Sequence, residues 1–305
     1  TLFRSADAVI MQEQVERDED QISFTANPQT GQNIRRAGED IQQGQVILQQ
    51  GCRIRAQELG LAASIGCSEL TVRRPLRVGM FFTGDELVEP GRELAPGQIY
   101  DSNRYTLSGL LQTLGCEIID LGIVGDTLQQ TTEALQQAAQ QADLIISCGG
   151  VSVGEEDHVR IALEQMGELF MWKLNIKPGK PLAFGRVAGA AFLGLPGNPV
   201  SVFATFCLFV TPFIKKMQGR TDLTAPLLKV RADFDWPHPD NRKEFLRARL
   251  HLDQQHHPSV SIYHNQSSGV LTSTSWADGF VIINEGQPIK SGDMVDYLSF
   301  KELLG

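Results

Sequence analysis

The chain has 305 residues, of which 42% are hydrophobic and 21% charged, so it can bury the core of about one to three domains. Its formal net charge of −9 argues against a general affinity for nucleic acid or an anionic membrane, so an anionic ligand needs a local basic patch. The five cysteines form no Cys-x-x-Cys pair, which argues against a zinc knuckle or a disulfide framework and fits a reducing cytoplasm. The first residues lack a signal-peptide core and an initiator Met, so we expect a fragment of a longer protein.

Two short segments precede the first strongly apolar strand. Residues 1–42 alternate weakly in polarity and break at Asn27-Pro28 and at Gly31, which predicts a few strands and turns without a sufficient core of their own. Residues 43–75 form a second small unit, in which Ala56 to Gly66 has helical spacing.

Residues 76–222 alternate between apolar strands and amphipathic helices. Strands are predicted at residues 76–82, 117–124, 143–148, 169–174, 181–185 and 190–195, and helices at residues 101–114, 128–141, 157–166 and 198–218. This alternation predicts a mostly parallel sheet with helices on both faces, a three-layer α/β/α domain. The longest apolar run, Val202 to Ile214, is too short to span a bilayer and is interpreted as a buried core helix.

After Gly219 the pattern changes to short alternating runs between turns. These runs lie at residues 227–234, 245–252, 260–263, 279–283 and 293–300. Such a pattern predicts a small β-barrel or sandwich.

One stretch concentrates positive charge on this acidic chain. Lys173, Lys177 and Lys180 stand close together around a Pro-Gly turn. Two further turns offer backbone NH groups, the glycine-rich segment Gly149 to Asp157 and the turn Pro196 to Pro199. Lysines and loop amides together suit a phosphorylated, anionic ligand. Taken singly, a lysine turn is usually a solvated loop, glycines often serve backbone geometry, and a proline turn is often only a helix start.

Acidic residues follow the ends of several predicted strands. Glu86, Asp126 and Asp157 each come shortly after a strand. Ligands of open α/β sheets bind beyond the carboxyl ends of the strands, so these carboxylates are expected to converge near Lys173 and Lys177. Converging carboxylates suit Mg²⁺, which usually also takes phosphate oxygens from a substrate. Two other interpretations stay open: Asp126 or Asp157 caps the following helix, and Glu86 is a solvated turn residue.

These motifs, in this order, resemble those of the molybdopterin molybdenumtransferase family, which includes the MoeA proteins and the E domain of gephyrin. The resemblance runs from about residue 6 to the C-terminus. It is carried by Ala37 to Ile41, Thr83 to Leu87, Gly97 to Asn103, Gly149 to Asp157, Lys177 to Pro181 and Leu195 to Ser201. The Gly-Gly-x-Ser-x-Gly loop alone is shared with related adenylyltransferases and competence-damage-type proteins. One departure is Phe82, where the family more often has Ser.

The resemblance implies the last step of molybdenum cofactor synthesis. Members of the family bind adenylylated molybdopterin and molybdate, cleave the adenylate with a divalent cation, usually Mg²⁺, and leave molybdenum on the dithiolene. By matching positions, the implied catalytic residues are Asp40, Glu86, Asp126, Asp157, Lys173 and Lys177, with Glu86, Asp126 and Asp157 as metal ligands. The implied substrate-binding residues are Thr83, Gly84, Gly149, Gly150, Ser152, Gly154, Lys180, Pro196, Gly197, Asn198 and Pro199.

The resemblance also implies the domain organisation and the setting. Residues 1–42 would be the remnant of a lid domain, 43–75 part of an N-terminal dimerisation domain, 76–222 the molybdopterin-binding α/β domain and 223–305 a C-terminal β-barrel. Family members carry a further segment before the position of Thr1, and the lid of one subunit closes over the pocket of the other. We therefore expect a homodimer whose site is incomplete in this fragment. A cytoplasmic protein is expected, which meets the preceding adenylyltransferase and recipient molybdoenzymes but neither nucleic acid nor membrane.

Two other functions stay open. The first is nucleotidyl transfer to molybdopterin, as in the related adenylyltransferases, although the lid-like first segment and the β-rich C-terminal domain argue against it. The second is a scaffold like gephyrin, whose E domain clusters receptors, although the chain offers no sign of a receptor-binding tail.

Overall fold

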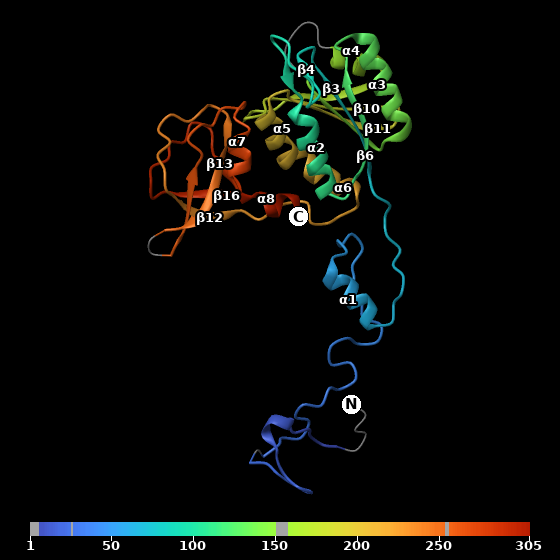
Figure 1. The fold of residues 1–305 in the computed structure, drawn as a ribbon, viewed down its shortest axis with the longest axis vertical. Helices are drawn as coiled ribbons and strands as arrows, with labels where there is room; N and C mark the ends of the chain where they lie inside the picture. The colour runs from blue at the N-terminus through green and yellow to red at the C-terminus, as the bar shows by residue number, and fades with distance from the viewer. Residues whose placement is uncertain (1–5, 26, 151–157, 254–255) are drawn as a thin grey trace. The chain divides into compact units, whose positions relative to one another are not determined.

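The computed structural model of the chain describes residues 6–25, 27–150, 158–253 and 256–305 (Figure 1). The chain divides into two compact units. The smaller unit holds residues 1–50 and 54–70, and the larger unit holds residues 51–53 and 71–305. Most of the predicted site residues belong to the larger unit.

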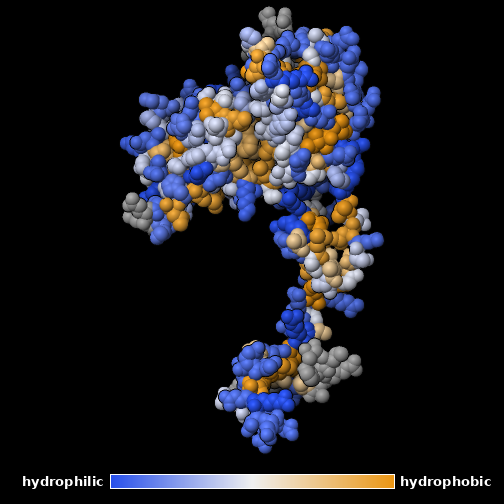
Figure 2. Space-filling model, viewed as in Figure 1, coloured by the Kyte–Doolittle hydropathy of each residue, from blue (hydrophilic) through white to orange (hydrophobic). Residues whose placement is uncertain are grey.

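The smaller unit has little core of its own. Its regular elements are the 3₁₀-helix η1 (Gln12–Gln14), the antiparallel strands β1 (Glu16–Asp18) and β2 (Gln21–Ser23), and the helix α1 (Ala56–Ser64). Ala62 is its only buried apolar side chain among the described residues, whereas Leu59 and Ile65 are more than half exposed. Figure 2 shows apolar surface at the place of α1 in Figure 1. The weak alternation of residues 1–42 predicted this lack of a core.

A six-stranded sheet forms the centre of the larger unit. In spatial order its strands are β6 (Glu117–Val124), β3 (Arg77–Thr83), β7 (Leu144–Cys148), β11 (Ala190–Leu195), β10 (Pro181–Val187) and β8 (Gly167–Lys173). The first four are parallel, and β10 runs antiparallel to both of its neighbours. The prediction of a mostly parallel sheet is therefore confirmed, with one reversed strand.

Helices cover both faces of this sheet. One face carries α2 (Ser102–Thr113) and the helical segment Pro199–Met217, and the other carries α3 (Leu128–Gln141) and α4 (His158–Met166). The side chains of β3 alternate between the two faces: Val78, Met80 and Phe82 belong to the first core cluster, and Phe81 belongs to the second. Burial on both faces explains the nearly continuous apolar runs of these strands. The three-layer α/β/α prediction is confirmed.

One long apolar helix crosses the first core cluster. It consists of α5 (Pro199–Thr205), a π-helical turn (Phe206–Val210) and α6 (Thr211–Met217). Pro212 has no backbone N–H, and the N–H of Thr211 reaches back to Phe206 O, which accounts for the wider turn. By length and composition this helix is apolar enough to cross a membrane, but most of it is buried inside the protein. The interpretation as a core helix therefore holds.

The C-terminal strands close into a barrel. They are β12 (Leu228–Ala232), β13 (Lys243–Leu252), β14 (Pro258–Ile262), β15 (Gly279–Ile283) and β16 (Met294–Ser299). They pair in the order β14-β12-β16-β15-β13, and β13 also pairs with β14, which closes the ring. The barrel, and not the sandwich, is therefore the correct prediction. Two short helices, α7 (Thr272–Trp276) and α8 (Phe300–Leu304), pack against it.

A two-residue strand joins the sheet domain to the barrel. This strand, β9 (Ile176–Lys177), follows β8 and pairs in parallel with Lys243 and Glu244 of β13. Two residues are too few to show a period, so the sequence did not predict β9. A separate two-stranded sheet, β4 (Leu87–Val88) with β5 (Ile99–Tyr100), follows β3.

The sheet core yields a stability prediction. Phe192 on β11 is fully buried in the second core cluster, so Phe192→Ala is expected to lower the free energy of unfolding by about 3–5 kcal/mol. Phe170→Ala is the matched control, because Phe170 on β8 is 55% exposed, and its cost is expected to stay below about 1 kcal/mol. Urea denaturation measures both, and equal losses would contradict the described core.

Candidate functional site

One cavity of about 1040 Å³ lies where the main sheet meets the barrel. Its sheet side is formed by residues at the carboxyl ends of β3, β7 and β11, which are Thr83-Gly84, Gly149-Gly150 and Pro196 to Pro199. Its barrel side is formed by Arg242 and the loop Gln266 to Ser268. The cavity thus occupies the position where α/β sheets usually bind ligands.

The structure brings most of the predicted site residues to this cavity. It is lined by Thr83, Gly84, Glu86, Asp126, Gly149, Gly150, Lys177, Lys180, Pro196, Gly197, Asn198 and Pro199. Lys173, at the end of β8, is exposed and does not line the cavity, although its strand partner Pro181 does. Ser152, Gly154 and Asp157 lie outside the described residues.

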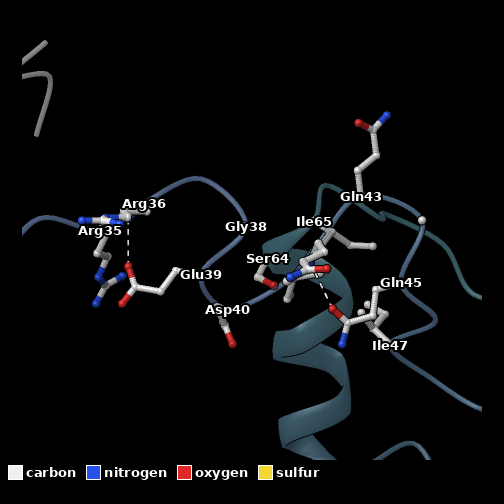
Figure 3. Close-up of a pocket in the computed structure, with 13 residues that line it drawn as sticks. Arg35, Arg36, Gly38, Glu39, Asp40, Gln43, Gln45, Ile47, Ser64 and Ile65 are labelled. Carbon is white, nitrogen blue, oxygen red and sulfur yellow. Dashed lines mark hydrogen bonds between the residues drawn. The ribbon is translucent and has the colours of Figure 1, made fainter.

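Asp40 belongs to a different cavity, of about 860 Å³, within the smaller unit (Figure 3). That cavity is lined by the loop 35–47 and by Ser64 and Ile65 near the end of α1. Asp40 lies beside Glu39, whose Oε2 accepts a hydrogen bond from the Arg36 backbone N at 2.8 Å. The structure therefore places Asp40 in a separate unit from the other predicted site residues.

Two glycines allow the strand ends of the larger cavity to approach closely. Gly149 has a φ of +91°, and a Cβ at this position would lie 2.3 Å from Thr83 O. Gly84 has a φ of +151°, a conformation that other residues rarely adopt. Backbone geometry therefore favours glycine in both places.

Glu86 and Asp126 bring two carboxylates to the cavity. The N-cap of α3 is Thr127, whose Oγ1 accepts from Gln130 N at 3.3 Å, so Asp126 does not cap this helix. No cluster of three His, Cys, Asp or Glu side chains suited to a metal occurs in the part of the chain that the structure describes. Mg²⁺ is usually bound by one or two carboxylates together with substrate phosphates, so this pair fits that ion.

Lys177 is held by acidic side chains of the barrel. Its Nζ lies 3.1 Å from Glu244 Oε1 and 3.4 Å from Asp240 Oδ2. Glu244 is fully buried, and its Oε2 accepts from Trp236 Nε1 at 2.8 Å and from Asp240 N at 2.9 Å. Lys180 also lines the cavity, is exposed, and forms no ion pair with any residue in the described ranges. Of the two lysines, Lys180 is therefore the more available to a ligand.

Arg242 is a cation of the cavity that the sequence patterns did not single out. Its Nε and Nη2 donate to Asp240 Oδ1 and Oδ2 at 2.9 and 2.8 Å. This guanidinium is the main cause that holds the pKa of Asp240 well below its usual range. The charged run Asp240 to Glu244 before a strand is the only signal that the sequence offers for this role.

Asp101 and Asn103 line the cavity, and each has a buried oxygen that lacks a hydrogen-bond partner among the described residues. Asp101 caps α2, since its Oδ1 accepts from Arg104 N at 3.2 Å, and burial raises the pKa of this carboxyl. Asn103 Nδ2 donates to Gly197 O at 2.7 Å and ties α2 to the proline turn. Asp101 Oδ2, Asn103 Oδ1 and Thr83 Oγ1 find no partner among the described residues. These unsatisfied atoms arise from tertiary burial, which no local sequence pattern indicates.

Three family models match the chain in order. The MoeA N-terminal region (domain I and II) matches residues 2–66, the probable molybdopterin binding domain matches residues 79–216, and the MoeA C-terminal region (domain IV) matches residues 229–300. The chain is 42% identical to the molybdopterin molybdenumtransferase of Haemophilus influenzae over 302 residues. The aligned region covers 98% of this chain and 75% of that protein. The chain belongs to the molybdopterin molybdenumtransferase family.

Other members of the molybdopterin molybdenumtransferase family agree with this assignment. The Nostoc protein of that name is 34% identical over 293 residues, covering 94% of this chain and 67% of its own length. A crystal structure of the MoeA protein of Pyrococcus horikosii matches with a TM-score of 0.75 and 30% identity, covering 96% of this chain and 72% of that one. The family resemblance drawn from the motifs is thereby confirmed, as are the transferase class and the MoeA-like fold.

Phe82, where the chain departs from the molybdopterin molybdenumtransferase pattern, lies between the core and the cavity. Phe82 is fully buried in the first core cluster and also contributes to the cavity wall. The position therefore adds to the packing of the core beside Thr83, where a Ser would offer a hydroxyl group instead.

Lys177→Ala and Lys180→Ala should separate ligand binding from stability. Each removes a cation from the cavity, and a charge-assisted contact is worth about 1.5–3 kcal/mol, so the affinity for molybdate or inorganic phosphate should fall about tenfold or more. Lys177→Ala also leaves the buried Glu244 without its cation, which should lower the free energy of unfolding by about 1–3 kcal/mol. Lys180→Ala should leave thermal stability unchanged.

Calorimetric titration and thermal denaturation of the two variants measure these effects separately. Wild-type affinity in both variants would remove the lysines from the site. An equal loss of stability in both would contradict the role of the Lys177–Glu244 ion pair.

Proposed function

We propose that the chain inserts molybdenum from molybdate into adenylylated molybdopterin and releases AMP, the last step of molybdenum cofactor biosynthesis. The observation that carries this proposal is one cavity that combines cations with carboxylates. Lys177, Lys180 and Arg242 line the same cavity as Glu86 and Asp126. Both substrates are anions, and the relatives compared above are named molybdopterin molybdenumtransferases.

The cations suit the oxyanions of both substrates. Arg242 presents a planar guanidinium, which can donate paired N–H bonds to phosphate or molybdate oxygens. Lys180 adds a mobile point charge, and Ser267 and Ser268 of the barrel line the same cavity. These groups would also stabilise the negative charge that develops on the phosphate oxygens as AMP leaves. Because the cations come from both the sheet domain and the barrel, the oxyanion site requires both domains.

Glu86 and Asp126 would hold the divalent cation, and Mg²⁺ fits this donor set. Such an ion, when bound, polarises the phosphate oxygens of the adenylate. Asp126 is available for this role because Thr127 caps α3 in its place. Asp157, outside the described residues, stays in the proposal as a third carboxylate.

The smaller unit supports a proposal about assembly. It exposes Val46, Leu59 and Ile65 while burying almost no apolar side chain of its own. Exposed apolar groups on so small a core favour burial in an interface. We therefore propose a homodimer in which residues 43–75 contribute to the interface and residues 1–42, with Asp40, form part of a lid.

The cellular location and the partners of the protein are proposed on the same grounds, its membership of the family. We propose a cytoplasmic enzyme that takes its substrate from an adenylyltransferase and passes its product to molybdoenzymes. Nucleotidyl transfer is the weaker candidate, because the cavity takes Arg242 and a serine-containing loop from the barrel, a domain that the single-domain adenylyltransferases lack.

Incubation of the protein with adenylylated molybdopterin, Mg²⁺ and increasing molybdate tests the proposed function. AMP release is expected to depend on molybdate. Formation of pyrophosphate from ATP and molybdopterin would favour nucleotidyl transfer instead. Retention of membrane-receptor loops in a pull-down, without AMP release, would favour the scaffold.

Asp126→Asn and Thr127→Ala should have opposite effects in this assay. Asp126→Asn removes a negative charge that a hard cation needs, so AMP release should collapse at limiting Mg²⁺ while the melting temperature stays close to that of the wild type. Thr127→Ala removes the cap of α3, so stability should fall by about 1 kcal/mol while AMP release is kept. Wild-type turnover by Asp126→Asn at limiting Mg²⁺ would exclude Asp126 as a metal ligand.

A further inference from the structure

Arg247, on β13, is the largest fully buried side chain of the described structure, with 1% of its surface exposed. It lies on the face of β13 that points away from the barrel core, since Leu246 and Ala248 belong to that core and Phe245 packs into the first core cluster. A buried arginine normally has a carboxylate partner. Within the described ranges no Asp or Glu forms an ion pair with Arg247, and burial alone lowers its pKa to about 10. The side chain is therefore a buried, charged group without an acidic partner at neutral pH.

The hydrogen bonds of Arg247 reach residues between Tyr263, whose backbone N donates to Arg247 O at 3.0 Å, and Ser273. Its Nη2 donates to Ser267 O at 3.2 Å, and its Nε donates to Ser273 Oγ at 3.0 Å. Its backbone N donates to Gln266 Oε1 at 2.9 Å, and its backbone O accepts from Gln266 Nε2 at 3.0 Å. The main chain and the side chain of Arg247 thus together hold the start of the Gln266–Ser268 loop, which lines the cavity.

The far end of this loop is attached to the sheet domain. Val200 N, in the first turn of α5, donates to Ser268 O at 3.0 Å. The loop Gln266 to Ser268 is therefore held by Arg247 on the barrel side and by α5 on the sheet side. Both attachments must be kept for Ser267 and Ser268 to stay in the cavity wall.

We propose that Arg247 is a positioning residue for oxyanion binding: it fixes the Gln266–Ser268 loop, and its unpaired buried charge favours an anion in the cavity that this loop lines. A methionine of similar length would fill the same space without the desolvation cost of a charge, so packing alone does not account for an arginine. A charge in a low-dielectric interior acts over a longer range than one in water, and a bound anion would supply the missing opposite charge. The inference rests on the proposed function only for the identity of the oxyanion.

Calorimetric titration of molybdate and of inorganic phosphate into Arg247→Met, Arg247→Lys and Arg249→Met tests this role. Arg249 is the matched control: it lies two residues along the same strand face, is exposed, stacks on Trp276 and does not line the cavity. We expect Arg247→Met to lose about tenfold or more in affinity, Arg247→Lys to recover most of it, and Arg249→Met to match the wild type. Wild-type affinity in Arg247→Met, a loss in Arg249→Met equal to that in Arg247→Met, or an undetectable affinity of the wild type for both oxyanions would overturn the inference.

A second variant keeps the test decisive if Arg247→Met does not fold. Ser273→Ala removes one acceptor of the guanidinium and keeps the charge, so affinity should fall about threefold with little change in melting temperature. Unchanged affinity in Ser273→Ala together with the loss of affinity in Arg247→Lys would then overturn the inference.

Turnover separates this inference from the proposed function. If AMP is released, Arg247→Met should raise the KM for molybdate about tenfold and leave kcat at saturating molybdate close to that of the wild type. If no AMP is released but oxyanion binding still depends on Arg247, the proposed function fails and the positioning role stands.

Discussion

The pairing of β9 with β13 joins the sheet domain to the barrel at the cavity, and it positions the charged side chains on the barrel side. Only Ile176 and Lys177 on one side and Lys243 and Glu244 on the other make this contact. It sets Lys177 Nζ 3.1 Å from the buried Glu244 Oε1, as an ion pair and not as a well-directed hydrogen bond. A buried carboxylate is costly unless donors and an opposite charge surround it, and Trp236 and the Asp240 backbone supply the donors to its other oxygen. The junction thereby brings Arg242 and the Gln266–Ser268 loop to the ends of the sheet strands.

The charge distribution around this junction explains how an acidic protein can bind anions. With a net charge of −9, attraction must come from a local arrangement. Asp240 binds both Arg242 and Lys177 and so orients two cations at once. In the described part of the chain, neither Lys180 nor Arg247, which holds the Gln266–Ser268 loop, has a carboxylate partner. Asp240 therefore orients Arg242 and Lys177, whereas the charges of Lys180 and Arg247 are left to attract a ligand.

The regular elements could be predicted from the sequence because their signals are local. β6, α3 and β11 have the predicted bounds, each marked by an apolar period that ends at glycine or polar residues. Apolar runs carry no sign of direction, so the reversal of β10 was not predicted. Nearness in sequence placed Lys173 with Lys177, yet Lys173 does not line the cavity, whereas its strand partner Pro181 does. Arg242, Arg247 and the unsatisfied Asp101 Oδ2 were missed, because their roles arise from contacts between segments far apart in the chain.

The position of molybdenum in a crystal of the protein soaked with molybdate would test the oxyanion site most directly. Diffraction data collected at the molybdenum absorption edge would show the metal by its anomalous scattering. A peak is expected in the cavity between Lys180 and Arg242, beside the Gln266–Ser268 loop. A peak only in the smaller unit near Asp40, or none at a concentration that saturates binding in solution, would contradict it.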